Sequence, residues 1–217
     1  MTTDSAHGHS PLSLEAYAAA NGVKPRSMRE HRRVIHGCDA CAFRLEDTPP
    51  LMGDGPLPAS IVVVSHAARQ HDLLMGRGLA GAARNVVDAA IANAGIVTGV
   101  RFTSTIRCVP PDARPLSRSE QDHCREHLLA ELLLAAPDVI VTLGAAATAA
   151  VLNADGVYAA AVGKPLQLTP TVALLATVDP MDVLKGARAD MVALRRDFLL
   201  ANALTGADNR ALKRAHG

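Results

Sequence analysis

Four cysteines are the residues of this sequence whose type and spacing point most directly to chemistry. Cys38 and Cys41 form a C-x-x-C pair, Cys108 precedes two prolines, and Cys124 lies in the charged segment DHCREH. Two disulfides would need an oxidising compartment, and the N-terminal sequence has no basic-then-apolar signal for export. A C-x-x-C pair beside basic residues is also not a typical buried core pattern. The arrangement therefore favours a metal centre with four thiolate ligands.

The spacing of the second cysteine pair bears on which metal is bound. Structural zinc sites usually combine two C-x-x-C pairs, whereas fifteen residues separate Cys108 from Cys124 here. Cys108 follows a predicted strand, and Cys124 lies in a predicted helix. This spacing is less typical of zinc and is compatible with a 4Fe–4S cluster held by four thiolates.

A second candidate site lies in the segment VVVSHAAR, residues 62–69. Three β-branched residues predict the end of a buried strand, and the small polar segment after them contains His66. In a parallel sheet the loops at the carboxyl ends of the strands meet and form the ligand site. His66 is therefore either a residue of such a site or a polar group tolerated in a loop.

The elements needed to position these residues alternate along the chain. Buried strands are predicted at residues 60–65, 101–108, 138–144 and 171–180, and helices at 80–96, 117–137, 145–156 and 191–204. Continuous apolar strands alternating with helices predict a three-layer α/β/α fold around a central, mainly parallel four-stranded sheet. Ser117 and Glu120 form a capping box for the second of these helices, and Pro137 ends it.

Length and composition limit the remaining possibilities. The chain has 217 residues, 49% of them hydrophobic and 2% aromatic, with a net charge of +1. These values predict one α/β domain with an aliphatic core, and a DNA-binding protein of this charge would need its basic residues on one face. No apolar run reaches the ~18 residues of a membrane span. We expect a cytoplasmic monomer that does not associate with membranes.

Three regions are predicted. Residues 1–36 form an N-terminal arm with one helix at 13–22 and a basic segment, KPRSMREHRR, that is either a solvated surface or a contact for phosphates. Residues 37–200 form the α/β domain with the metal centre. Residues 201–217 form a basic C-terminal tail.

Longer segments in the same order resemble one family. Besides the cysteines, the resemblance rests on GRGLAGAARNVVDAAIANAGI, TSTIRCVPP, PDVIVTLGAAATAAVL and ALLATVDPMDVLKG. Together they are similar to the iron–sulfur uracil-DNA glycosylases of family 4 and their relatives in family X, from Cys38 to about Phe198. The resemblance implies a uracil-DNA glycosylase fold, a 4Fe–4S cluster on the four cysteines and DNA as a partner.

The resemblance also indicates where the family's site residues would fall. Removing a base requires a flipped nucleotide, a group that positions water, a donor to the departing base, an aromatic platform and an amide that binds the base edge. At the four family positions for these groups, the acid is replaced by His66, the His by Asp179, the Phe by Leu79 and the Asn by Ser104. Ordinary uracil excision is therefore not expected.

Three functions stay open. The protein binds DNA without excising uracil, or it is a glycosylase for a different or modified base, or the fold has been kept as a protein-interaction module. If it is an enzyme, the resemblance gives His66 and Asp179 as catalytic and places five further residues at the substrate: Ser65, Arg69, Leu79, Ser104 and Arg107. We expect His66 and Asp179 to face each other in one cavity with Ser104 and Leu79. If the pair is functional, the carboxylate should raise the pKa of the imidazole.

Overall fold

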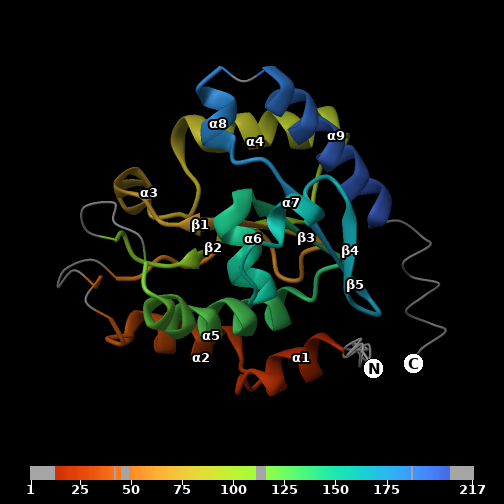
Figure 1. The fold of residues 1–217 in the computed structure, drawn as a ribbon. Helices are drawn as coiled ribbons and strands as arrows, with labels where there is room; N and C mark the ends of the chain where they lie inside the picture. Colours follow the sequence, from red (N-terminus) through yellow and green to blue (C-terminus); the bar gives the residue numbers. More distant parts are fainter. Residues whose placement is uncertain (1–12, 42, 45–48, 111–115, 187, 206–217) are drawn as a thin grey trace, which may run out of the picture.

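The computed structural model describes residues 13–41, 43–44, 49–110, 116–186 and 188–205. Its elements, labelled in Figure 1, follow one another in the order α1 (Leu14–Ala20), α2 (Met28–His36), β1 (Ile61–Ala67), α3 (Gln70–Met75), α4 (Gly81–Asn93), β2 (Val100–Ile106), α5 (Arg118–Ala135), β3 (Val139–Leu143), α6 (Gly144–Leu152), α7 (Tyr158–Ala161), β4 (Pro165–Thr169), β5 (Val172–Thr177), α8 (Pro180–Leu184) and α9 (Arg188–Leu204). Among these residues no helix is both long enough and apolar enough to cross a membrane.

The predicted three-layer α/β/α fold is confirmed, with one strand more than expected. The sheet has the order β2-β1-β3-β5-β4, and the four predicted strands, β1, β2, β3 and β5, run parallel. The additional strand β4 pairs antiparallel with β5 at the edge of the sheet. It lacks a continuous apolar run because an edge strand buries one face only: Leu166 and Leu168 are half-buried, whereas Pro165 is exposed.

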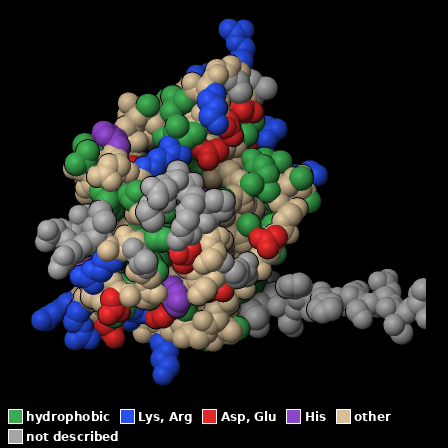
Figure 2. Space-filling view, turned by 60° about the vertical axis from the view of Figure 1, so that its left-hand side comes forward, with side chains coloured by type: hydrophobic (Ala, Val, Ile, Leu, Met, Phe, Trp, Pro, Cys, Tyr) green, Lys and Arg blue, Asp and Glu red, His purple; other side chains and the backbone are tan. Residues whose placement is uncertain are grey.

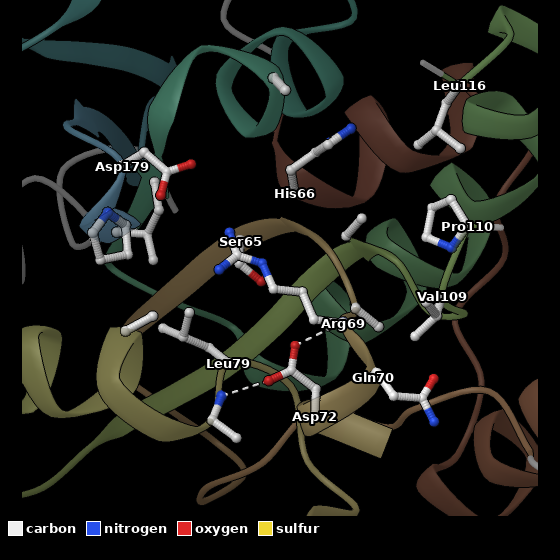
Figure 3. A pocket seen from close by; sticks show the side chains of 17 residues that line it. Ser65, His66, Arg69, Gln70, Asp72, Leu79, Val109, Pro110, Leu116 and Asp179 are labelled. Atoms are coloured by element: carbon white, nitrogen blue, oxygen red, sulfur yellow. Dashed lines mark hydrogen bonds between the residues drawn. The ribbon is translucent and has the colours of Figure 1, made fainter. Parts of the chain in front are cut away.

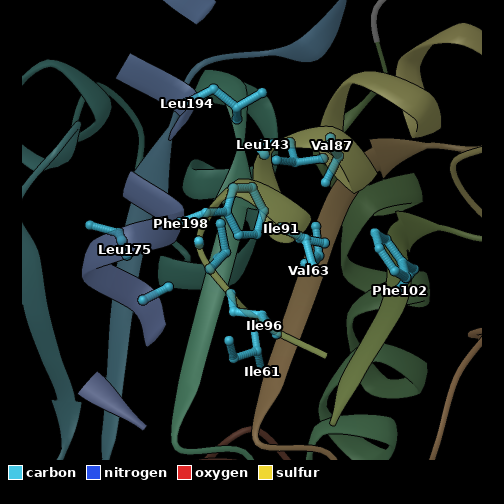
Figure 4. Close-up of a cluster of buried hydrophobic side chains, with 14 of the residues drawn as sticks. Ile61, Val63, Val87, Ile91, Ile96, Phe102, Leu143, Leu175, Leu194 and Phe198 are labelled. Atoms are coloured by element: carbon cyan, nitrogen blue, oxygen red, sulfur yellow. The ribbon is translucent and has the colours of Figure 1, made fainter. Parts of the chain in front are cut away.

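Alternating side chains of the strands build two cores, one on each face of the sheet. Ile61 and Val63 of β1 point to the face covered by α4, α8 and α9, where Phe198 is fully buried (Figure 4). Val62 and Val64 point to the opposite face, against α5 and the N-terminal helix α1. In Figure 1 the sheet lies between these two helical layers. Burial on both faces explains why each parallel strand is a continuous apolar run.

The N-terminal region is more regular than predicted. The basic segment after α1 forms a second helix, α2, which begins after Ser27, whose hydroxyl accepts a hydrogen bond from the Glu30 N–H. His31 and Ile35 of α2 are fully buried, and both α1 and α2 pack on α5. Residues 1–12 and 206–217, with most of the predicted basic tail, lie outside the described residues. The proposed boundaries at residues 36 and 200 stay a prediction. The boundary at residue 200 falls within α9, which continues to Leu204.

The connections between strands and helices define the edge of the sheet where the site lies. Helix α5 begins with the predicted capping box of Ser117 and Glu120. The chain leaves β1 into α3, leaves β3 directly into α6, and leaves β5 into α8. Because β1, β3 and β5 are parallel, these three connections lie at one edge of the sheet.

Candidate nucleotide-binding cavity and cysteine cluster

A cavity of about 610 Å³ opens at the carboxyl ends of β1, β3 and β5. Of the predicted site residues, it brings together Ser65, His66, Arg69, Leu79 and Asp179 (Figure 3). The rest of the wall is mainly apolar and consists largely of Ala, Leu, Val and Pro side chains from α4, α6 and the loop after Cys108, while α3 contributes the polar Gln70 and Asp72. This volume is within the range of small-ligand pockets.

His66 is half-buried near the end of β1, and its closest polar contacts come from β2. Its Nδ1 lies 3.1 Å from Oγ1 of Thr105, and the Thr105 hydroxyl donates a hydrogen bond to the His66 carbonyl. Burial lowers the pKa of His66 below its usual value, and the opposing effect of the Asp179 carboxylate is smaller. The imidazole is therefore neutral near pH 7.

His66 and Asp179 are expected in one cavity and, if the pair is functional, within hydrogen-bond range directly or through one water. Both residues line the cavity, but no hydrogen bond joins them among those described. In Figure 3 the imidazole is directed away from Asp179. The Asp179 carboxylate acts to raise the pKa of His66, as expected, but burial outweighs it and the net direction is downward.

Asp179 is the N-cap of the short helix α8. Its Oδ1 accepts a hydrogen bond of 2.8 Å from the Met181 N–H. The first residue of α6, Gly144, has φ +81°, and a Cβ there would lie 3.1 Å from Cβ of Asp179. Glycine at this position therefore lets α6 approach the Asp179 loop closely.

Asp72 is a site residue that the sequence reasoning missed. Its carboxylate is 4% exposed, and it accepts hydrogen bonds from the N–H groups of Arg69 at 2.9 Å and Ala80 at 2.7 Å, drawn as dashed lines in Figure 3. These bonds close the loop that runs from β1 through α3 to α4. Leu79 in this loop has φ +54°, a left-handed conformation that the two bonds hold in place.

Ser104 and Arg107 do not lie where they were expected. Ser104 is buried in β2 outside the cavity wall, and its hydroxyl donates to the Ile106 carbonyl at 2.9 Å. Arg107 is 1% exposed and forms an ion pair with Glu131 of α5 at 2.5 Å, so it is not a surface contact for phosphate.

Glu131 is the centre of a buried charged network. Arg101 donates to its Oε1 at 2.6 Å and Thr103 to its Oε2 at 2.9 Å. Burial opposes the ionised form, but the guanidinium groups of Arg107 and Arg101 lower the pKa of Glu131 overall. The network joins α5 to β2 directly before Cys108.

The four cysteines come from three parts of the fold. Cys38 and Cys41 follow α2, Cys108 follows β2, and Cys124 lies in α5; none of the four is in a disulfide. Cys108 and Cys124 are buried beside Phe43 and Ile106, with Cys41 packed against them. Burial, and then electrostatic repulsion by the other three thiols, raise the pKa of Cys108 to about 12.

The cysteines therefore lie within electrostatic range of one another, as expected for a shared ligand set. Among the described residues, however, no group of three or more His, Cys, Asp or Glu side chains is arranged to hold a single metal ion. The metal centre stays a prediction.

The mainly parallel sheet, the cavity at its strand ends and the four cysteines together point to a class of protein. Residues 52–201 match the profile of the uracil DNA glycosylase superfamily, and the chain belongs to that superfamily.

Three curated relatives are named type-4 uracil-DNA glycosylases, which confirms the resemblance to family 4. The one from Thermotoga maritima is 32% identical over 114 residues, covering 52% of this chain and 59% of the relative. The Archaeoglobus fulgidus protein is 30% identical over 122 residues, covering 56% and 61%. The Pyrobaculum aerophilum protein is 25% identical over 130 residues, covering 59% and 66%. The matches thus span less than two thirds of each relative.

Proposed function

We propose that this protein binds DNA as an iron–sulfur member of the superfamily and does not excise uracil at a rate typical of the family. The observation that supports this most directly is the composition of the cavity at the strand ends. It has the volume for a flipped nucleotide, but Leu79 stands at the position of the aromatic platform, and Ser104 lies outside the wall. A poorly fitted base that leaves buried polar groups unpaired can lose orders of magnitude in rate.

DNA attraction would come from exposed cations rather than from net charge. Arg29, Arg32 and Arg33 of α2 are exposed. Figure 2 shows Lys and Arg side chains gathered at the lower left of the face in view. Phosphate contacts of this kind give a binding constant that falls steeply with salt. The basic segment of the N-terminal region thus takes the role of a phosphate contact in this proposal.

The test combines binding and excision in the same samples. Fluorescence anisotropy with labelled duplex and single-stranded DNA, with and without uracil, gives the affinity as salt is varied, and alkali treatment reveals abasic sites. We expect salt-dependent binding and no more strand breaks in uracil DNA than in control DNA. Rapid uracil release would contradict the proposal, as would a lack of binding at physiological salt with co-purification of a protein partner.

A triple variant tests the role of α2. Changing Arg29, Arg32 and Arg33 to Gln should reduce the salt slope by up to ~3, since each phosphate contact contributes about 0.9. The matched control changes three exposed cations on other elements, Lys164, Arg188 and Arg195, to Gln. An equal loss of affinity in both triple variants would show that α2 is not the contact surface.

The metal centre in this proposal is a 4Fe–4S cluster on Cys38, Cys41, Cys108 and Cys124. The donor set fits this group, because two buried and two half-buried thiols whose ionised forms repel one another would be stabilised as thiolates by a cationic iron centre. When bound, the cluster supplies a structural link between the N-terminal helices, β2 and α5. Anaerobically purified protein should contain about four irons per chain. Stoichiometric zinc in protein made with adequate iron would contradict this assignment.

A second candidate function is excision of a different or modified base. It is favoured by the presence of both His66 and Asp179 in the cavity wall, since an imidazole can position water or move a proton. Release of a base from a panel of modified oligonucleotides, lost in the His66→Phe variant, would establish this function in place of binding alone.

A further inference from the structure

The Thr105 hydroxyl makes two contacts with His66 and has one proton to donate. Thr105 lies opposite His66 in the parallel ladder, between the pairs Ser65–Ser104 and Ala67–Ile106. Its Oγ1 is in hydrogen-bond contact with the His66 carbonyl and lies 3.1 Å from the His66 Nδ1. Thr105 is 2% exposed, so water does not compete freely for these contacts.

The two contacts fix the tautomer of the imidazole. A carbonyl oxygen can only accept, so the Thr105 proton must point to the His66 carbonyl. Oγ1 can then only accept from Nδ1, which requires the proton of the neutral ring on Nδ1. Nε2 consequently has a free lone pair, and no described residue donates a hydrogen bond to it.

The ring keeps this form near neutral pH. Burial opposes a second proton and lowers the pKa of His66, and the Asp179 carboxylate offsets this in part. Asp179 also lines the cavity, with one oxygen accepting from the Met181 N–H. The Nε2 atom and the carboxylate are both hydrogen-bond acceptors, on the walls contributed by β1 and α8.

We propose that Thr105 holds His66 as a fixed acceptor, so that this cavity prefers a nucleobase with an exocyclic amino group to uracil. The inference rests on the proposed DNA binding and names the base class for the same cavity. At the ring position where cytosine and adenine have an amino group that donates to an acceptor, uracil has its O4 carbonyl, which places acceptor against acceptor; the N3–H donor of uracil lies at the neighbouring ring position. Two facing acceptors leave buried polar groups unpaired and disfavour that base.

The direct test of the tautomer is a two-bond proton–nitrogen NMR correlation of the histidine rings at neutral pH. The His66 signals are assigned by their loss in the His66→Phe variant. We expect Nδ1 to be the protonated nitrogen, and the Thr105→Val variant to shift the ring toward the Nε2–H form. The Thr105→Ser variant keeps the hydroxyl and should behave like the native protein. An Nε2–H form in the native protein would overturn the inference.

The base preference is tested with oligothymidylate strands, because thymine has no amino group. One central position is cytosine or uracil in one pair of strands, and adenine or unsubstituted purine in the other. The strand with the amino group should bind about 2- to 10-fold more tightly, the value of one neutral hydrogen bond. The ratio should fall to about 1 in Thr105→Val and persist in Thr105→Ser.

The outcomes separate this inference from the proposed function. Equal binding of both members of each pair by the native protein would overturn the amino-group preference while leaving DNA binding intact. If no strand binds at all, the proposed function and the preference both fail, and the NMR experiment still decides whether Thr105 fixes the tautomer.

Discussion

Acid should destabilise this protein through His31, a fully buried residue of α2. Neither ring nitrogen of His31 has a hydrogen-bond partner among the described residues. Burial, and then the positive charge of Arg107, lower its pKa to about 4, while Glu131 acts in the opposite direction. Smaller contributions from Arg26 and His127 in the same direction are included in this value.

The direction of the pH effect follows from this lowered value. The pKa is about 4 in the folded protein and about 6.5 in the unfolded chain, so between these values the unfolded chain binds the proton more readily. The stability that neutral His31 provides is complete above pH ~6.5 and is lost as the pH falls toward ~4. Between pH 7 and pH 5 the loss is about 2 kcal/mol.

The assay is anaerobic urea unfolding at the two pH values, with the native protein and the His31→Leu variant. For the native protein, the free energy of unfolding should fall between pH 7 and pH 5. In the His31→Leu variant this fall should be smaller by about 2 kcal/mol. The control is His71→Gln, at an exposed histidine of α3. A His31→Leu variant with the full native pH dependence would refute the reasoning, as would an NMR titration of the His31 ring with a midpoint near 6.5.

Three further predictions concern single positions. Glu131→Gln should destabilise the protein by about 3–5 kcal/mol in urea unfolding, because the buried charges of Arg101 and Arg107 would lose the carboxylate that balances them. Glu126→Gln, at a side chain that is 53% exposed, is the control, and an equal effect of both changes would count against the network. Asp72→Ala should cost about 1–3 kcal/mol, since it leaves the N–H of Ala80 buried without its acceptor, and faster hydrogen exchange at that amide would report the same loss. Gly144→Ala should cost about 1–2 kcal/mol, because an L-residue at φ +81° is strained, and Gly76→Ala, where a Cβ meets no atom within 4 Å, separates backbone strain from crowding against Asp179.

The sequence predicted the parallel strands of the core correctly, but it did not predict helix α2 or the edge strand β4. Val62 to Val64 predict a buried strand because both faces of that strand are covered, and the structure has β1 there. Helix α2 was missed because its charges dominate the segment. Two signals in the sequence could have found it. Ser27 lies three residues before Glu30, and His31 and Ile35, which the structure buries, are four residues apart, as on one face of a helix.

The candidate site was also predicted only in part, because some of its contacts depend on how distant segments pack together. Resemblance to a family places His66 and Asp179 at the ends of β1 and β5, and the parallel topology then brings them into one cavity. Thr105 was not found because its role depends on the register of β2 against β1, which sequence periodicity does not determine. Arg107 was misplaced because its partner, Glu131, lies in α5 and is far from it in the sequence.

The packing of α2 and the position of the cysteines depend on each other. Cys38 follows directly after α2, so the burial of His31 and Ile35 against α5 decides where the C-x-x-C pair lies. The same α5 contains Cys124, and its Glu131 pairs with Arg107, the residue before Cys108. The contacts of α5 thus bring three separate segments of the chain together. A cluster bound there would add its binding energy to contacts that already hold its ligands near one another, and acid that charges His31 would weaken both together.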